Sequence, residues 1–184
     1  VFRIRHCSSE TWLGETRRHN KYTTIRRDAK NAKKMNKNLT REISAGIVVY
    51  RETQEGPKFL LLYHGGNYWN FAKGKIEVGE KSFEAAVRET LEETGLKAED
   101  MRIKNRFKAY EKYFFFNKDK NKVFKTVVFY LGEVKRKDIK ISDEHHGFGW
   151  FLYRDARRLL KTYRDSESVL RKAYDFVRQS TPEK

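Results

Sequence analysis

Three glutamates stand close together in a segment that is predicted to be a helix. Glu89, Glu92 and Glu93 occupy positions i, i+3 and i+4, so their carboxylates share one helical face. Like charges at this spacing destabilise an isolated helix by about a few tenths of a kcal/mol per pair. A bound cation would offset that repulsion. Because the ligand atoms are carboxylate and carbonyl oxygens, with no cysteine or clustered histidine, the set favours Mg²⁺ or Mn²⁺ over zinc.

The residues around this face indicate phosphate chemistry. Arg88 precedes Glu92 by four residues and is expected to orient it through an ion pair, and Glu80 stands in the loop before the helix. Mg²⁺ held by few carboxylates recruits substrate phosphates and lowers the pKa of a bound water. A spare carboxylate can take a proton from that water. The alternative is a solvated acidic helix face without a catalytic role.

The helix that carries these glutamates has recognisable ends. Ser82 is a good N-cap, and Gly95 suits the left-handed position that follows a helix. A buried stripe is predicted from residues at helical spacing, namely Phe83, Val87, Leu91 (with Thr90) and Thr94.

Short β-branched and apolar runs predict the remaining elements. Strands are expected at 43–50, 58–64, 102–116, 123–134 and 148–153, and further helices at 154–162 and 166–179. The glycine-rich residues 65–80 are expected to form a long structured loop. Because strands and helices alternate, the pattern predicts a layered α/β domain with a mixed sheet.

The composition fits one domain with a basic extension. The 184 residues are 38% hydrophobic and carry a formal charge of +16. Residues 1–34 hold ten Lys/Arg and three Asp/Glu without a regular hydrophobic period, which predicts disorder. We therefore divide the chain into an extension, 1–39, and a domain, 40–184. The extension could be an arm that touches nucleic acid or a transit peptide. It could also be a plain disordered tail, or a segment that is not native because the protein starts at Met35. We favour the disordered tail or the non-native segment over a functional role.

The charge and the single cysteine bound the partners and the compartment. A balance of +16 favours phosphate-bearing partners such as nucleotides, RNA or an anionic membrane, although solubilising lysines are the alternative. Cys7 alone cannot form an intrachain disulfide, which indicates a reducing compartment. No apolar run approaches the roughly 18 residues of a membrane span, and no secretory signal is visible. We expect a cytoplasmic monomer without membrane attachment.

The complete pattern around the glutamates resembles the signature of the Nudix hydrolases. It reads Gly74, five residues, Glu80, seven residues, Arg88-Glu89, two residues, Glu92-Glu93, one residue, Gly95 and an apolar residue. The resemblance implies an α/β/α sandwich that hydrolyses a nucleoside diphosphate linked to another group, with Mg²⁺ or Mn²⁺. It implies that Glu92 and Glu93 hold metal with the Lys73 carbonyl, and that Glu89 shares a metal or acts as base. Thr90 replaces the family's bulky aliphatic residue.

The flanking residues resemble one branch of that family, the asymmetrical diadenosine tetraphosphate hydrolases. "YWNFAKGKIEVGE" is similar to that family's "W-x-P-P-K-G-H-x-E-x-G-E", with Ala72 and Lys75 as departures. "FKTVVFYLGEV" and "SDEHHGFGW" are similar to two later stretches. The resemblance implies that Lys73 and Lys125 hold the polyphosphate and that Tyr113 and Phe148 stack on adenine. It also places Glu144 opposite the glutamate helix, as a metal ligand or general base.

Each of these assignments has a simpler alternative. The two aromatics could be core residues, Lys125 an exposed strand lysine and Glu144 a surface-loop residue. Strand alternation puts Tyr113 and Phe115 on one face and Phe114 and Phe116 on the other. Of the adjacent histidines, His145 is the better candidate for a contact. Alternative functions are removal of pyrophosphate from RNA 5′ ends, hydrolysis of oxidised nucleoside triphosphates, and non-catalytic RNA binding.

Overall fold

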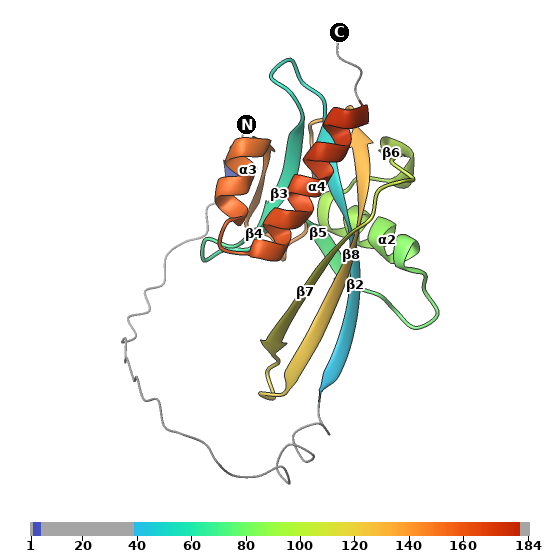
Figure 1. Ribbon diagram of the computed structural model, residues 1–184, viewed down its shortest axis with the longest axis vertical. Coiled ribbons are helices and arrows are strands. Elements are labelled where there is room, and N and C mark those ends of the chain that lie inside the picture. The colour runs from blue at the N-terminus through green and yellow to red at the C-terminus, as the bar shows by residue number, and fades with distance from the viewer. Residues whose placement is uncertain (1, 5–38, 181–184) are drawn as a thin grey trace.

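The computed structural model describes residues 2–4 and 39–180, which form one mixed β-sheet between helices (Figure 1). The strands run in the order β1-β9-β3-β2-β8-β6, with β4 beside β3, β5 beside β2 and β7 beside β8. The long central pair β2 and β8 is parallel, and the other pairs are antiparallel. The predicted layered domain with a mixed sheet is confirmed.

The elements have the following bounds. The strands are β1 Phe2–Ile4, β2 Thr40–Arg51, β3 Lys58–Tyr63, β4 Trp69–Asn70, β5 Ala72–Lys75, β6 Met101–Ile103, β7 Ala109–Phe116, β8 Lys122–Val134 and β9 Gly147–Leu152. The helices are α2 Ser82–Thr94, the short 3₁₀ turn η1 Ala98–Asp100, α3 Tyr153–Leu160 and α4 Arg164–Ser180.

Two apolar layers lie on the two faces of the sheet. On one face, α3 and α4 cover a cluster that includes Phe59, Phe129 and Leu170. On the other face, α2 covers a second cluster that includes Ile47 and Tyr130. In Figure 1, α3 and α4 lie across one side of the sheet and α2 lies on the other. The helices thus form the two outer layers of an α/β/α sandwich.

The buried side of α2 differs from the predicted stripe. Thr90 and Thr94 are buried as expected, but Phe83 and Leu91 are exposed. The helix instead presents small residues to the sheet, including Ala85. Small side chains let the helix approach β2 closely, and the larger apolar residues are consequently rotated toward its outer side. The helix also starts at an N-cap one residue earlier than predicted, Lys81.

The predicted loop between β3 and α2 contains two short strands. β5 lies antiparallel to β2, with Ala72 opposite Ile47 and Lys73 opposite Gly46. A Cβ on Gly46 would stand 2.1 Å from the Ala72 carbonyl oxygen, so a side chain there would push the strands apart. This close approach fixes the position of the residues that lead into α2.

Of the basic extension, 1–39, the structure describes residues 2–4 and residue 39. Phe2–Ile4 form β1, which pairs antiparallel with β9, so these three residues depart from the predicted disorder. Residues 5–38 of the predicted extension lie outside the described residues. Within the described part of the chain, no helix has both the length and the apolar character needed to cross a bilayer.

Candidate active site

Arg88 forms ion pairs with three of the carboxylates in the candidate site. Its guanidinium donates to Glu80 through Nε at 2.9 Å, to Glu89 at 2.8 Å and to Glu92 at 3.1 Å. A further bond runs to the Lys75 carbonyl at 3.0 Å. The ion pair predicted between Arg88 and Glu92 is therefore present, and the same guanidinium also joins the loop carboxylate to the helix.

Glu93 is largely buried, with a side chain that is 13% exposed. Its Oε2 accepts a hydrogen bond from the Lys73 main-chain N–H at 3.0 Å. Burial raises its pKa to about 7, and the neighbouring charges of Glu89 and Glu144 add to the rise, while Lys73 opposes it. A buried carboxylate with this pKa can hold or release a proton near neutrality.

Gly74 allows Glu89 to occupy its place beside β5. A Cβ at position 74 would lie 2.0 Å from the Glu89 Cδ, well inside any real contact distance. The glycine is thus required by the carboxylate that packs on its Cα. This contact gives a physical reason for the first glycine of the motif.

A histidine cluster closes the other side of Glu93. His145 is buried, its Nδ1 lies 2.9 Å from the Ser142 Oγ and its Nε2 lies 3.9 Å from the Glu93 Oε1. Burial lowers the pKa of His145, and the Lys73 charge adds to this effect. His64 packs edge-on against His145 with ring centroids 4.6 Å apart. Of the two adjacent histidines, His145 is thus buried beside Glu93, whereas His146 is exposed and packs against Tyr63.

The oxygen ligands fit a hard divalent cation, although they are not gathered into a metal cage. Across residues 2–4 and 39–180, no group of three or more His, Cys, Asp or Glu side chains is arranged to hold a metal ion. Arg88 accounts for this, because it draws Glu89 and Glu92 to itself. The donors are nevertheless all oxygens, and the raised pKa of Glu93 marks a negative charge that burial leaves poorly compensated.

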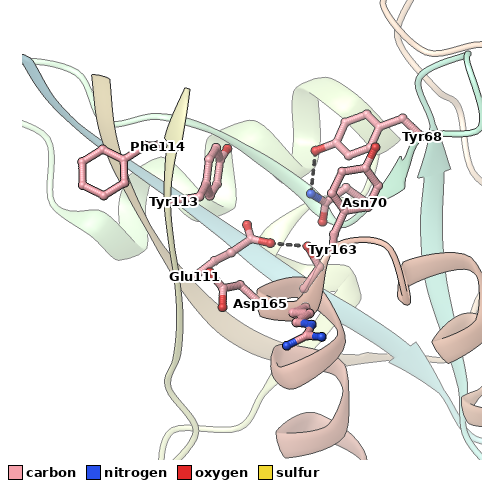
Figure 2. Close-up of a pocket in the computed structure, with 9 residues that line it drawn as sticks. Tyr68, Asn70, Glu111, Tyr113, Phe114, Tyr163 and Asp165 are labelled. Carbon is pink, nitrogen blue, oxygen red and sulfur yellow. Dashed lines mark hydrogen bonds between the residues drawn. The ribbon is translucent and has the colours of Figure 1, made fainter. Parts of the chain in front are cut away.

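A cavity of about 490 Å³ lies on the opposite side of the sheet from α2. Its aromatic walls come from Tyr68, Tyr113 and Tyr163. Figure 2 shows Tyr113 and Tyr68 facing each other across this space, with the Glu111 carboxylate between them. Asn70 lines the same wall and donates to the Tyr68 hydroxyl at 2.8 Å.

Glu111 is a buried carboxylate at the floor of this cavity. It is 3% exposed, and its Oε1 accepts a hydrogen bond from the Ser166 hydroxyl. Its Oε2 is buried and has no hydrogen-bond partner among the described residues. Burial raises the pKa of Glu111, which the Ser166 hydrogen bond and the Lys73 charge partly oppose. A buried polar atom without a partner is costly, so this oxygen is available to a ligand.

Two lysines, Lys73 and Lys125, lie close to the acidic and aromatic residues of the candidate site. The Lys73 charge acts on both Glu93 and Glu111, so its ammonium lies within the field of both groups. Lys125 stands directly opposite Tyr113 in the β7–β8 register. Its Nζ forms an ion pair with the Glu42 Oε1 at 2.6 Å. Lys73 thus acts on carboxylates of both sides, whereas Lys125 lies on the same face of the sheet as the cavity residue Tyr113.

The predicted pairing of Tyr113 with Phe148 is wrong, because the two residues lie on opposite faces of the sheet. Tyr113 packs against the cluster under α3 and α4, whereas Phe148 packs against the cluster under α2. Strand pairing explains this: Phe148 stands opposite Leu62, which belongs to the α2 layer. Phe148 instead lines a separate cavity of about 260 Å³ with Trp150.

Several residues of this cavity were not predicted from the sequence. Glu111 carries a usable signal, because strand alternation places it on the same face as Tyr113. Tyr68 and Asn70 lie in the segment that was expected to be a loop, and Tyr163 and Ser166 come from the distant junction of α3 and α4. Only the tertiary fold brings these segments together.

The exposed Glu144 follows Ser142 in the loop before β9, close enough for its charge to raise the pKa of Glu93. The three α/β/α layers and the glutamates along α2 are the arrangement of a hydrolase of the Nudix type, and the aromatic cavity lies across the sheet from that helix. The chain belongs to the Nudix family, since residues 40–173 match the NUDIX domain model.

Among relatives, the chain is similar to asymmetrical bis(5′-nucleosyl)-tetraphosphatases. It is 33% identical over 149 residues to that of Mus musculus, which covers 76% of this chain and 97% of the relative. It is 31% identical over 137 residues to that of Caenorhabditis elegans, with 73% and 95% covered. Among solved structures, a C. elegans Ap4A hydrolase binary complex superimposes with a TM-score of 0.65 at 30% identity, covering 75% of this chain and 98% of that one.

Proposed function

We propose that this protein hydrolyses diadenosine tetraphosphate asymmetrically, to ATP and AMP, in the presence of Mg²⁺ or Mn²⁺. The observation that carries the proposal is the position of Lys73, whose charge acts on the buried Glu93 on one side and on the cavity residue Glu111 on the other. A base in the aromatic cavity would thus have its phosphates directed along the lysines toward α2. The similarity to asymmetrical tetraphosphatases supports this choice of substrate.

The residues proposed to bind the base differ from those that the sequence predicted. Tyr113 remains a stacking residue, and its facing partners are Tyr68 and Tyr163 instead of Phe148. Stacking of a base on an aromatic side chain contributes about 1–3 kcal/mol. The unpartnered Oε2 of Glu111 would accept a hydrogen bond from the exocyclic amine of adenine.

Lys73 and Lys125 would hold the phosphate chain. In the structure Lys125 forms an ion pair with Glu42, and a bound polyphosphate would compete with that carboxylate for the Lys125 ammonium. A point charge on a flexible stem suits bridging phosphate oxygens.

The carboxylates would hold the cation and move the proton. Glu89, Glu92, Glu93 and Glu144, together with the Lys73 carbonyl, are the residues that would hold Mg²⁺ or Mn²⁺. Such an ion neutralises phosphate charge and lowers the pKa of water when it is bound. Arg88 positions Glu89 and Glu92 by the ion pairs described above.

Glu89 or Glu144 would take a proton from the attacking water. The water oxygen then forms a bond to phosphorus while the anhydride P–O bond at that phosphorus breaks. Positioning and charge neutralisation supply most of the catalysis in such reactions.

The charge of +16 favours one second candidate, removal of pyrophosphate from the 5′ end of RNA.

The proposed activity is tested by incubating the protein with Mg²⁺ and, separately, with diadenosine tetraphosphate, a nucleoside triphosphate or a 5′-triphosphorylated RNA. The products are then separated by chromatography. ATP plus AMP, formed much more efficiently than the other products, is the expected result. Preferential release of pyrophosphate from RNA would overturn the proposal, and so would preferential cleavage of the nucleoside triphosphate.

A further inference from the structure

A row of exposed aromatic and basic side chains lies on the β7–β8 hairpin, outside the candidate active site. We call it the hairpin surface and define it by six residues: Tyr110, Lys112, Phe114, Phe116, Lys122 and Arg41. In Figure 1 the strands β2, β7 and β8 run on past the helices α3 and α4, so this part of the sheet projects from the layered body.

The strand register places these residues on one face. Phe114 stands opposite Phe124, which in turn stands opposite Arg41 of β2. Tyr110 stands opposite Val128, which packs against the cluster under α2. The hairpin surface therefore faces the α2 side, whereas Tyr113 and Glu111 point to the other side of the same strand.

The aromatic side chains of this surface are open to solvent. Tyr110 is 49% exposed, Phe114 54% and Phe116 70%. Single exposed aromatics are common on proteins, but these three occupy three of the four outward positions of one strand, and Lys112 occupies the fourth. The Lys122 Nζ lies 4.4 Å from the centroid of the Phe114 ring, so cations and rings are interleaved.

The charge of this surface is of one sign. The outward positions 110–116 of β7, 122–128 of β8 and 41–43 of β2 carry Lys112, Lys122 and Arg41, and no carboxylate. The turn that joins the strands adds Lys118 and Lys120 against one acid, Asp119. A partner protein that only covered apolar side chains would not need this excess of cations.

We propose that the hairpin surface binds single-stranded nucleic acid. Unpaired bases present flat faces that stack on successive aromatic side chains, and the phosphates between them pair with the interleaved lysines and arginine. Duplex nucleic acid hides its base faces and would leave the aromatic row unused. This binding goes beyond the proposed hydrolysis and does not depend on it, because of the six residues of the hairpin surface only Phe114 also lines the aromatic cavity.

The test uses the full chain and fluorescence anisotropy with labelled single strands of about 12 nucleotides, one of RNA and one of DNA. Tyr110→Ala with Phe116→Ala should weaken binding of at least one strand about tenfold or more, because stacking is lost. Phe114 is left unchanged because it also reaches the rim of the aromatic cavity. Lys112→Ala with Lys122→Ala should weaken binding and reduce the slope of log affinity against log salt by about 1.4.

The matched control is Lys161→Ala with Lys172→Ala, two exposed lysines at the helical side of the molecule. This variant loses the same charge and should keep at least the greater part of the binding. Thermal melting of all variants checks the fold independently of hydrolysis. The proposal is overturned if neither strand binds the wild type, if the control weakens binding as much as the hairpin variants, or if the hairpin variants change only self-association in sedimentation.

Discussion

At the residue scale, Arg88 answers the question raised by the glutamate-rich face. Its guanidinium pairs with Glu89 and Glu92, so part of the like-charge repulsion is offset within the chain. Glu93 is treated differently, since it is buried and held by the Lys73 main-chain N–H. The i, i+4 spacing made the pair of Arg88 and Glu92 predictable, but the burial of Glu93 depends on β5, which the sequence did not reveal.

Glu92 offers the most direct test of the carboxylate set. Glu92→Gln keeps the size of the side chain but removes the charge that would hold a cation, so turnover of diadenosine tetraphosphate should fall by about 100-fold or more. Because this side chain is 56% exposed, the melting temperature should change little. Steady-state kinetics and thermal melting measure both effects. Turnover close to that of the wild type would show that Glu92 is not an essential ligand.

Glu111 tests the revised base pocket. Glu111→Gln keeps the contact to Ser166 but offers a partly different set of hydrogen-bonding atoms to the cavity, so KM for diadenosine tetraphosphate should rise about tenfold with a smaller change in kcat. The free energy of unfolding should stay the same or increase, because a buried carboxylate is removed. An unchanged KM in steady-state kinetics would exclude this side chain from base recognition.

His64 should make stability depend on pH. Burial lowers its pKa to about 3, with help from the Lys73 charge, so the folded protein keeps it neutral while the unfolded chain titrates near 6.5. The unfolded state therefore binds the extra proton between about pH 3 and 6.5, and this contribution to stability is lost as the pH falls. The slope is about 1.4 kcal/mol per pH unit at most.

The raised pKa of Glu93 acts in the opposite direction, because a carboxyl with a folded pKa of about 7 loses stability as the pH rises from about 4.5 to 7. The comparison must therefore be between proteins. Urea unfolding of the wild type and of His64→Phe at several pH values isolates the contribution of the histidine. The free energy of unfolding of the wild type, relative to that of the variant, should increase as the pH rises from 4 to 6. Parallel curves would contradict the assignment.

At the element scale, strand and helix identities followed from periodicity, but the orientation of faces did not. β7 alternates as predicted, with Tyr113 partly buried and Phe114 exposed. The pairing of Phe148 with Tyr113 came from the family resemblance, and alternation could not test it because alternation does not say which helices cover which face. The side of Phe148 was decided by the pairing of β9 with β3, a long-range contact. Likewise α2 turned Ala85 toward the sheet, because a close approach favours small side chains over Phe83 and Leu91.

The junction of β5 and α2 gives a prediction at this scale. Gly74→Ala places a Cβ 2.0 Å from the Glu89 Cδ, so the carboxylate must move and turnover should fall. In a double-mutant cycle, Gly74→Ala should cost much less activity when Glu89→Ala is already present, because the clash has been removed. Additive losses in kcat/KM would show that the glycine acts through the backbone instead.

At the whole-molecule scale, the sheet separates the chemistry into two sides that meet at one edge. The aromatic cavity lies under α3 and α4, the carboxylates lie on α2, and Lys73 of β5 influences both. Helical spacing indicated Glu89, Glu92 and Glu93 and the family resemblance added Glu144, whereas the cavity needed three separate segments of the chain to be brought together. Binding of a cation at α2 should stabilise the folded protein as a whole, because the proposed ligands come from the helix, the loop before β9 and β5.

This coupling predicts a rise in melting temperature with Mg²⁺. At about 100 times the dissociation constant, a ligand that binds only the folded state adds about 2.7 kcal/mol, which corresponds to roughly 5–10 °C for a domain of this size. Thermal melting with and without Mg²⁺ measures the shift, and Glu92→Gln is the control that should lose most of it. Isothermal titration calorimetry provides an independent check. If Mg²⁺ and Mn²⁺ give neither heat nor a shift in the wild type, the carboxylate face works without a cation, and a non-catalytic binding role becomes the better account of this fold.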